Sequence, residues 1–343
     1  MIQINNYIKL VFTFFCLFIV SSCTKENHEI YNKTTTLRLN IPMLDVSSRV
    51  TEEGTDAENK IHSLRVLILD MDNNQIHNNK YSSSDIQENS ISIDNVPIGF
   101  IQLYVIANEE SLGKDYGNLT EWQNSVVDVD GTKKILFIDE NDSKKFPLKG
   151  SDFSANAPGL PMTWEAKTLE VKAQQSGQPQ EVKVELERAV AKINLVVSHG
   201  YENPISITNV SFGPFMGDRL YLFKENNNSE FPEVPSDAVY TSQVYGNLNV
   251  TLPQKTETRT LAIYVYPSFA WKSGEPEPYT IGFESSVGKY PAKPIMTSAG
   301  LPLRSMKRNT VLNIKVFISE TNVSFNFKVS GWDDKTIGVP EFE

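Results

Sequence analysis

The chain has 343 residues, of which 40% are hydrophobic and 22% charged, a composition typical of folded chains and not of disordered ones. Its formal net charge of −10 excludes a general nucleic-acid-binding surface, because phosphates require clustered lysine and arginine. The same charge argues against electrostatic adhesion to anionic lipids. We therefore expect a folded protein without nucleic acid among its partners.

The first 23 residues have the pattern of a bacterial lipoprotein signal. One cation, Lys9, precedes the apolar run Leu10–Val20, which is too short to span a bilayer and has the length of a signal-peptide core. Small residues then lead to Cys23. This ending predicts acylation of the Cys23 thiol, removal of residues 1–22 and anchoring in the cell outer membrane. The alternative is an ordinary secretory signal with an incidental cysteine.

Cysteine usage limits how the processed chain is stabilised. The other cysteine, Cys16, lies within the signal, so removal of the signal leaves Cys23 alone and no internal disulfide is expected. About 320 residues remain, enough for two ordinary domains held by core burial.

A period-two alternation of apolar residues predicts β-strands through most of the first half of the chain. After a polar tether at Thr24–Thr36, Leu37, Leu39 and Ile41 alternate with polar residues until Pro42. Asp45–Asn59 is polar and without periodicity, which predicts a loop. Further strands are predicted at Ile61–Leu69, Ile91–Val96, Phe100–Ala107, Val126–Val129, Lys134–Ile138 and Thr168–Ala173, with a short helix at Leu119–Ser125.

The second half continues the same pattern beyond Gln174–Gln180, a segment of low hydrophobicity that predicts a hairpin turn or a domain joint. One long strand is predicted from Val182 to Leu195. Others follow at Ile205–Phe212, Gly246–Leu252, Arg259–Val265, Tyr279–Glu284, Thr310–Ser319 and Val323–Val329. Many short strands separated by turn residues predict an all-β fold of two tandem β-sandwiches with few short helices.

The sequence contains no recognisable catalytic, cofactor or metal motif, so we expect no enzyme, no cofactor and no metal. The histidines lack metal-ligand spacing; they are His28, His62, His77 and His199. Asp70–Asn74 begins like a calcium loop, but Gln75 stands where the loop needs glycine and Tyr81 where it needs glutamate. We therefore predict a plain turn there, and another at Asp128–Gly131.

Tryptophan suggests one alternative function. A permanently lipid-anchored lipoprotein that binds glycans on the cell surface would need an exposed aromatic platform. The candidates are Trp122, Trp164, Trp271 and Trp332. Core and edge packing is the alternative interpretation of these four side chains.

Several segments carry a further signal: Ser48–Glu53, Lys60–Ile68, Val96–Asn108, Leu160–Trp164, Leu186–Ile193, Arg308–Val316 and Val329–Asp334. In this order, behind a lipoprotein signal, they resemble the fimbrillins, the lipoprotein-derived subunits of type V pili. The resemblance covers essentially the whole mature chain. It implies two transthyretin-like β-sandwiches and a structural subunit of a cell-surface pilus, or fimbria, that contributes to adhesion.

The resemblance also implies a maturation step. An arginine-specific surface protease cuts after the first strand, which corresponds here to the bond between Arg49 and Val50. The strand removed would be Thr36–Met43, whose apolar side chains are Leu37, Leu39 and Ile41. Arg38 and Arg65 are alternative arginines, but both lie in predicted strands and are expected to be poorly accessible. The precursor would thus sit on the outer membrane and the mature subunit in an extracellular pilus.

A terminal strand of another subunit, of the same or a different kind, would then replace the missing strand. The candidate donor in this chain is Thr336–Phe342, with apolar side chains at Ile337, Val339 and Phe342. Pro340 would interrupt its hydrogen-bond ladder. A tip or accessory subunit would accept a donor strand without providing one. The expected organisation is a propeptide at residues 23–49, a first sandwich at 50–180 and a second at 181–343.

Overall fold

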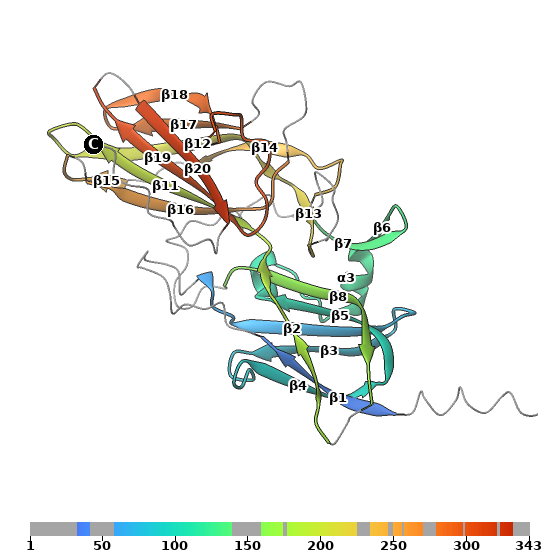
Figure 1. The fold of residues 1–343 in the computed structure, drawn as a ribbon. Coiled ribbons are helices and arrows are strands. Elements are labelled where there is room, and N and C mark those ends of the chain that lie inside the picture. Colours follow the sequence, from blue (N-terminus) through green and yellow to red (C-terminus); the bar gives the residue numbers. More distant parts are fainter. Residues whose placement is uncertain are drawn as a thin grey trace, which may run out of the picture.

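The computed structural model describes residues 33–41, 58–138, 159–173, 177–224, 234–245, 250–255, 257–269, 279–297, 299–320 and 323–331. Within these residues the chain is built mainly of β-strands, arranged as two sandwiches with a smaller sheet between them (Figure 1). None of the helices formed by these residues is long and apolar enough to cross a membrane.

The first sandwich consists of a small and a large sheet. The small sheet has the order β4 (Ser90–Pro97), β1 (Thr34–Asn40), β9 (Gln180–Lys183). The large sheet has the order β10 (Glu187–Arg188), β8 (Met162–Val171), β5 (Gly99–Ala107), β2 (Ser63–Asp70), β3 (Gln75–Ser82). Alternate aliphatic side chains of both sheets meet in the first core, which includes Leu37, Leu39, Val66, Ile93, Leu103 and Val182.

The large sheet of this sandwich is covered on both faces, which explains the continuous apolar run in β2. Leu64, Val66 and Ile68 point into the first core, whereas Leu67 and Leu69 point to the opposite face. That face is covered by the 3-10 helix η3 (Glu109–Leu112), the α-helix α3 (Leu119–Ser125), β6 (Val126–Val129) and β7 (Thr132–Ile138). The helix α3 has the predicted bounds, and the Asn118 side chain caps it by accepting a hydrogen bond from the Thr120 N–H.

The second sandwich also has two sheets. One has the order β16 (Arg259–Val265), β11 (Ala191–His199), β19 (Thr310–Ile318), β20 (Val323–Gly331). The other has the order β14 (Tyr240–Tyr245), β12 (Ile205–Gly217), β17 (Thr280–Ser285), β18 (Gly288–Pro294), with β15 (Val250–Leu252) also on β12. The second core lies between these sheets and includes Ile193, Leu195, Ile207, Phe212, Phe283, Leu312 and Ile314.

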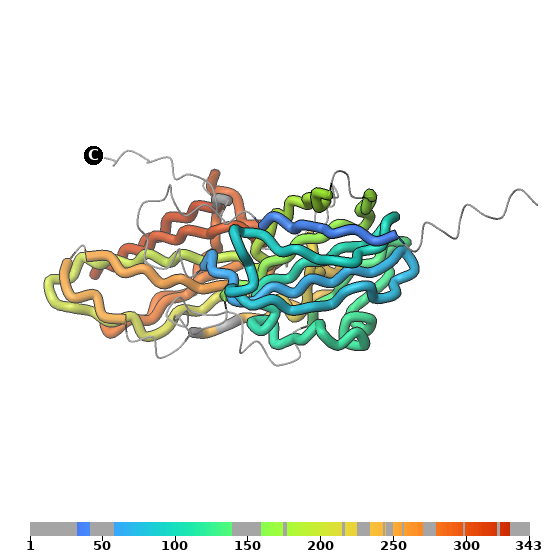
Figure 2. The backbone as a smooth tube through the Cα atoms, turned by 90° about the horizontal axis from the view of Figure 1, so that it is seen from below, coloured from blue at the N-terminus to red at the C-terminus, as the bar shows by residue number. Residues whose placement is uncertain are grey.

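A third core joins the two sandwiches. It gathers Trp122, Tyr104 and Phe137 from the first half of the chain with Phe223 and Tyr264 from the second. Beside it, β13 (Arg219–Tyr221) of the second half pairs antiparallel with β7 of the first. The molecule is elongated, with the two sandwiches end to end on either side of this joint (Figure 2).

The region between the sandwiches differs from the prediction. Instead of one strand from Val182 to Leu195, the chain forms three short strands, β9, β10 and β11. β9 pairs with β1 and β10 with β8, so residues 181–188 hydrogen-bond to the first sandwich although they were expected in the second. The apolar alternation is present, but alternation alone does not reveal where a strand changes partners.

Candidate functional site

The strand β1 occupies the middle of its sheet. It runs antiparallel to β4, with Leu39 opposite Ile91, and parallel to β9, with Leu39 opposite Val182. Among the described strands, β4 and β9 pair with no strand other than β1. Removing β1 would therefore leave the facing backbone groups of both neighbours unpaired, and unpaired strand edges are strong sites for adding another strand.

The inner face of β1 is completely buried in the first core. Leu37 and Leu39 have 0% of their surface exposed and Ile41 has 2%. Burial of three such side chains contributes roughly 5–9 kcal/mol, at about 1.5–3 kcal/mol each, before ordering costs. These are the three side chains expected to fill the sandwich. Their burial identifies β1 as an integral part of the first core in this form of the chain.

The outer face of β1 makes polar contacts with both neighbouring strands. Side-chain hydrogen bonds join Thr36 to Asp94 (2.7 Å), Arg38 to Ser90 (3.2 Å) and Asn40 to Glu181 (3.2 Å). Because these contacts lie at the surface, each contributes little to stability. The strand β1 is held in place mainly by the burial of its apolar face and by its backbone hydrogen bonds to β4 and β9.

Two arginines that were considered as alternative cleavage sites have different environments. The Arg65 side chain is 6% exposed in β2, as expected. The Arg38 side chain is 36% exposed, more than its position in a strand suggested, because it lies on the outer face of β1. The backbone of Arg38 is nevertheless paired on both sides. An extended strand fixed in a sheet does not fit a protease active site without local unfolding.

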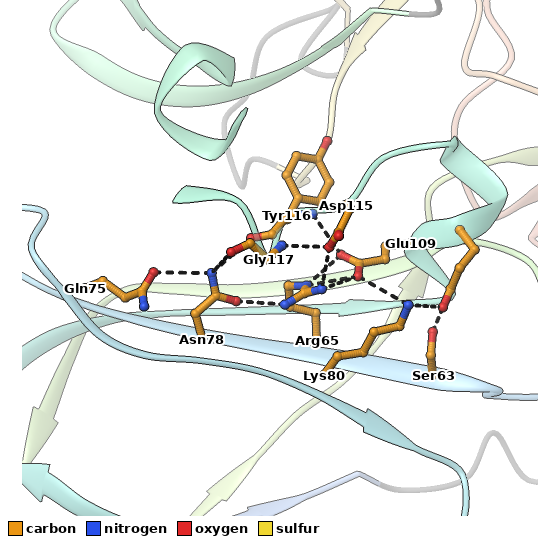
Figure 3. Close-up of polar contacts among 10 residues, drawn as sticks. Ser63, Arg65, Gln75, Asn78, Lys80, Glu109, Asp115, Tyr116 and Gly117 are labelled. Carbon is orange, nitrogen blue, oxygen red and sulfur yellow. Dashed lines mark hydrogen bonds and ion pairs between the residues drawn. The ribbon is translucent and has the colours of Figure 1, made fainter. Parts of the chain in front are cut away.

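Arg65 anchors the segment that covers the outer face of the large sheet (Figure 3). Its Nη2 lies 2.6 Å from Glu109 Oε1 and 2.8 Å from Asp115 Oδ1, and its Nη1 donates to Asn78 Oδ1 at 3.0 Å. Glu109 is 1% exposed, so Arg65 and Glu109 form a buried pair, and it is joined by several hydrogen bonds. The cluster attaches the start of η3 to β2, and it is a structural contact.

Lys80 extends this cluster to a second glutamate. It forms an ion pair with Glu110, whose Oε2 accepts a hydrogen bond from the Ser63 hydroxyl at 2.7 Å. Partial burial alone would raise the pKa of Glu110, but the hydrogen bonds from Lys80 and Ser63 outweigh it and lower that pKa. Glu110 therefore remains ionised at neutral pH, unlike a carboxyl group adapted to donate a proton.

A second buried cluster, consisting of Glu58, Lys192 and Tyr264, lies at the joint. Lys192 Nζ is 2.8 Å from Glu58 Oε1, and the Tyr264 hydroxyl donates to the same oxygen. Burial, together with the adjacent Glu58 carboxylate, raises the pKa of Tyr264. All three residues are at most 7% exposed. This Glu58 cluster ties the first described residue after the Arg49 segment to strands β11 and β16 of the second sandwich.

Arg188 and Arg308 complete the polar contacts at the joint. Arg188 donates to Asn309 Oδ1 at 2.8 Å and to the Asn59 side chain, and Arg308 donates to the Leu222 carbonyl at 2.9 Å. The Leu186–Ile193 and Arg308–Val316 motifs, far apart in sequence, are thus in contact. Both motifs were recognised in the sequence, but their contact was not predicted. The burial of Glu58 was not predicted either, because this residue lies in a polar stretch.

Comparison with known proteins places this architecture in a family. A family model described as fimbrillin-A associated anchor proteins Mfa1 and Mfa2 matches residues 32–338. The chain belongs to this family. The match includes β1 and extends beyond the last described strand, so it covers both sandwiches of the chain.

Two solved structures of fimbrial proteins have the same fold. The tip fimbrial protein Mfa3 of Porphyromonas gingivalis, with C-terminal truncation, has a TM-score of 0.54 at 16% identity, covering 88% of this chain and 100% of that one. A fimbrilin of the same organism has a TM-score of 0.50 at 14% identity, covering 88% and 98%. A putative cell adhesion protein of Parabacteroides distasonis has a TM-score of 0.49 at 15% identity, covering 87% and 97%. No curated protein matches the chain.

The expected fimbrillin family and all-β fold are therefore confirmed. As a member of the Mfa1 and Mfa2 family, the chain is a fimbrial, adhesion-associated protein. The family indicates the cell-surface fimbria as its location and other fimbrial subunits as its partners. The family and the neighbouring structures comprise fimbrial proteins and not enzymes.

The turn at Asp70–Asn74 does not have the geometry of a calcium-binding loop. Asp70 Oδ1 accepts from the backbone N–H of Asp72 at 2.9 Å and of Asn74 at 2.8 Å, which closes a turn between β2 and β3. Burial tends to raise the pKa of Asp70, but the hydrogen bonds from Asn74 and Asp72 lower it. Among the described residues there is no group of three His, Cys, Asp or Glu side chains that could hold a metal ion.

Two of the four tryptophans do not form a platform for sugars. Trp122 is 1% exposed and packs edge-on against Tyr104 at 4.8 Å and Tyr116 at 5.7 Å in the third core. Trp164, in β8, is half-buried against the first core. Trp271 and Trp332 lie outside the described residues.

Several predicted site residues also lie outside the part of the chain that the structure describes. They are Cys23, Arg49, Val50, Ile337, Val339 and Phe342. Of the predicted maturation machinery, the structure thus places only the strand expected to be removed.

Proposed function

We propose that this chain is a fimbrial subunit that is exported as a lipoprotein acylated at Cys23 and activated by cleavage between Arg49 and Val50. The position of β1 carries the proposal. The strand fills the middle of a sheet and the first core, yet it precedes the cleavage segment, residues 42–57, in the sequence. One cut in this segment separates β1 covalently from everything that follows it.

Cleavage changes the status of β1 from part of the chain to a bound peptide. Before the cut, its effective concentration at the site is set by a short connection; afterwards it can dissociate and be diluted. Residues 23–49 then leave together with the lipid, so release from the membrane and opening of the space between β4 and β9 are one event. In the remaining chain, Glu58 is attached to the joint by its contacts with Lys192 and Tyr264.

A strand of another subunit fills the opened space in the assembled fimbria. A donor that runs in the direction of β1 would be antiparallel to β4 and parallel to β9, and it needs apolar side chains at alternate positions to replace Leu37, Leu39 and Ile41. Ile337 and Val339 stand at alternate positions and would enter another subunit in this way, whereas Phe342 falls one residue out of this alternation. A tip subunit of the same design would accept a strand and provide none.

The proposal is tested by treating the purified lipidated precursor with an arginine-specific protease. We expect a new N-terminus at Val50, loss of the β1 peptide, and multimers that resist SDS. Arg49→Lys keeps the charge but removes the cleavage site, and it should leave the precursor intact and monomeric. Arg38→Lys is the matched control, since it alters an arginine in β1 and should be processed normally.

Two results would contradict the proposal. One is a precursor that is cut cleanly at Arg49 but keeps β1 and stays monomeric. The other is processing that persists unchanged in the Arg49→Lys variant.

A further inference from the structure

Two large apolar side chains are exposed together at one end of the first sandwich. Phe100 is 58% exposed and Met71 is 49% exposed. β2 and β5 are antiparallel, and Asp70 lies opposite Ile101. Met71, which follows Asp70, and Phe100, which precedes Ile101, are therefore neighbours. Phe100 follows the β4–β5 turn and Met71 follows the end of β2. We call this pair the apolar end of the first sandwich.

The apolar end lies where β1 begins. The Ile98 N–H, in the β4–β5 turn, donates to the Lys33 carbonyl at 3.0 Å, directly before β1. In both views the start of β1 is at the end of the first sandwich farthest from the second sandwich (Figures 1 and 2). The chain upstream of Lys33 therefore joins the folded protein beside Phe100.

The lipid on Cys23 would be close to this end. Ten peptide steps separate Cys23 from Lys33. They span at most about 36 Å when fully extended. A short tether thus keeps the apolar end, rather than the second sandwich, next to the bilayer.

We propose that the apolar end is the membrane-contact surface of the lipidated precursor, with Phe100 and Met71 inserted into the lipid interface. This inference rests on the acylation of Cys23 in the proposed function. The charges around the end are of both signs, since Lys172 lies 3.3 Å from Glu170 beside Phe100, and Lys33 and Asp72 are also nearby. The contact is therefore apolar and needs no anionic lipid.

A membrane fits this surface better than a second copy of the chain. An aromatic side chain offers roughly 150–250 Å² in total, so two partly exposed side chains provide far less than the roughly 800 Å² per partner of a stable protein interface. A bilayer requires no such area when an acyl anchor already holds the protein. Local insertion of two side chains is then enough to orient it.

The orientation has a consequence for maturation. β1 rises away from the apolar end by about 20 Å over its seven residues. Ile41 and Glu58, which flank the cleavage segment, therefore lie at the end of the first sandwich away from the bilayer. In this orientation, the two residues between which the cleavage segment is attached lie away from the bilayer.

The experiment places a fluorophore at the apolar end of the full-length lipidated precursor. Because Cys23 is acylated and Cys16 is removed, Phe100→Cys introduces the only free thiol, which is labelled with an environment-sensitive dye. The precursor is reconstituted into phosphatidylethanolamine vesicles that contain a lipid with a shallow nitroxide quencher. Val244→Cys is the matched control, since Val244 is 59% exposed but lies on β14 of the second sandwich.

We expect a blue shift and a loss of fluorescence at position 100, none at position 244, and the same result as at position 100 for Met71→Cys. If the precursor floats with the vesicles but the dye at position 100 is not quenched, the result supports acylation of Cys23 and contradicts the proposed membrane-contact surface. If the precursor does not float, the proposed lipid delivery fails and the inference with it. Equal quenching at both positions would also overturn the inference. A blue shift that occurs without lipid and grows with protein concentration would overturn it too, because it would indicate that the apolar end binds a second copy of the chain.

Discussion

At the scale of single residues, the joint between the sandwiches depends on charged side chains that are almost fully buried. Glu58 is 2% exposed and Lys192 is 7% exposed, and each is the ion-pair partner of the other. An unpaired charge in such a place would cost several kcal/mol, so the two residues are coupled energetically. The pair fixes the position of Glu58, the first described residue after the cleavage segment.

Glu58→Gln should therefore destabilise the chain. The substitution keeps the shape and a hydrogen-bond acceptor for Tyr264 but leaves the Lys192 ammonium without its carboxylate. We expect a loss of about 3–5 kcal/mol in the free energy of unfolding, measured by urea denaturation at pH 7. The control is Glu88→Gln: Glu88 lies 3.8 Å from Arg38 with a side chain that is 89% exposed, and its loss should have no measurable effect. Equal effects of the two substitutions would contradict this account of the joint.

This pair could not be predicted from the sequence. Glu58 falls in a polar stretch that indicates a loop, and most glutamates in such stretches are solvated. Its burial depends on strands β11 and β16, more than 100 residues downstream, which meet it only in the folded protein. By contrast, the burial of Leu37, Leu39 and Ile41 was predictable, because it follows from alternation within one strand.

At the scale of elements, strands with a clear apolar period were predicted from the sequence, and strands without such a period were missed. β1, β2, β5 and β19 contain regular buried residues and lie close to their predicted ranges. β3 and β18 were missed, since they carry few buried side chains and lie at sheet edges. Edge strands need no apolar face, so they lack the signal on which such prediction rests.

Strand partners were beyond the reach of the sequence as well. The parallel pairing of β1 with β9 joins residues more than 140 positions apart. Nothing in the Gln180–Lys183 segment distinguishes it from the continuation of a longer strand. It is this pairing that places β1 in the middle of its sheet and makes it a candidate for replacement.

Leu39→Ala should separate the role of β1 in the precursor from its role in the mature subunit. In the precursor the substitution leaves a cavity in the first core, and we expect a loss of about 2–5 kcal/mol in the free energy of unfolding. After cleavage at Arg49, the chain that begins at Val50 no longer contains position 39. Its stability, measured by the same urea denaturation, should then equal that of processed wild type.

Arg38→Ala is the control for this comparison, because it shortens the neighbouring side chain on the outer face of β1. It should change the stability of the precursor by much less than Leu39→Ala. If mature Leu39→Ala remained destabilised relative to mature wild type, β1 would not have left the chain.

At the scale of the whole molecule, the two sandwiches are connected by more than a linker. The third core, the β7–β13 pairing and the Glu58 cluster all cross from one half of the chain to the other. A joint packed in this way resists bending better than a flexible connection. We therefore expect the two sandwiches to unfold together.

Phe223→Ala is expected to weaken this coupling without disturbing either sandwich core. The Phe223 ring lies 5.3 Å from Tyr104 and 6.2 Å from Trp122, and all three belong to the third core. Wild type should unfold in a single calorimetric transition, whereas Phe223→Ala should show two, one for each sandwich. The matched control is Phe283→Ala, which removes a ring from the second core. It should lower the stability of the second sandwich while the joint stays intact, so that the single transition shifts to a lower temperature. One shifted transition in both variants would mean that the coupling does not depend on the third core.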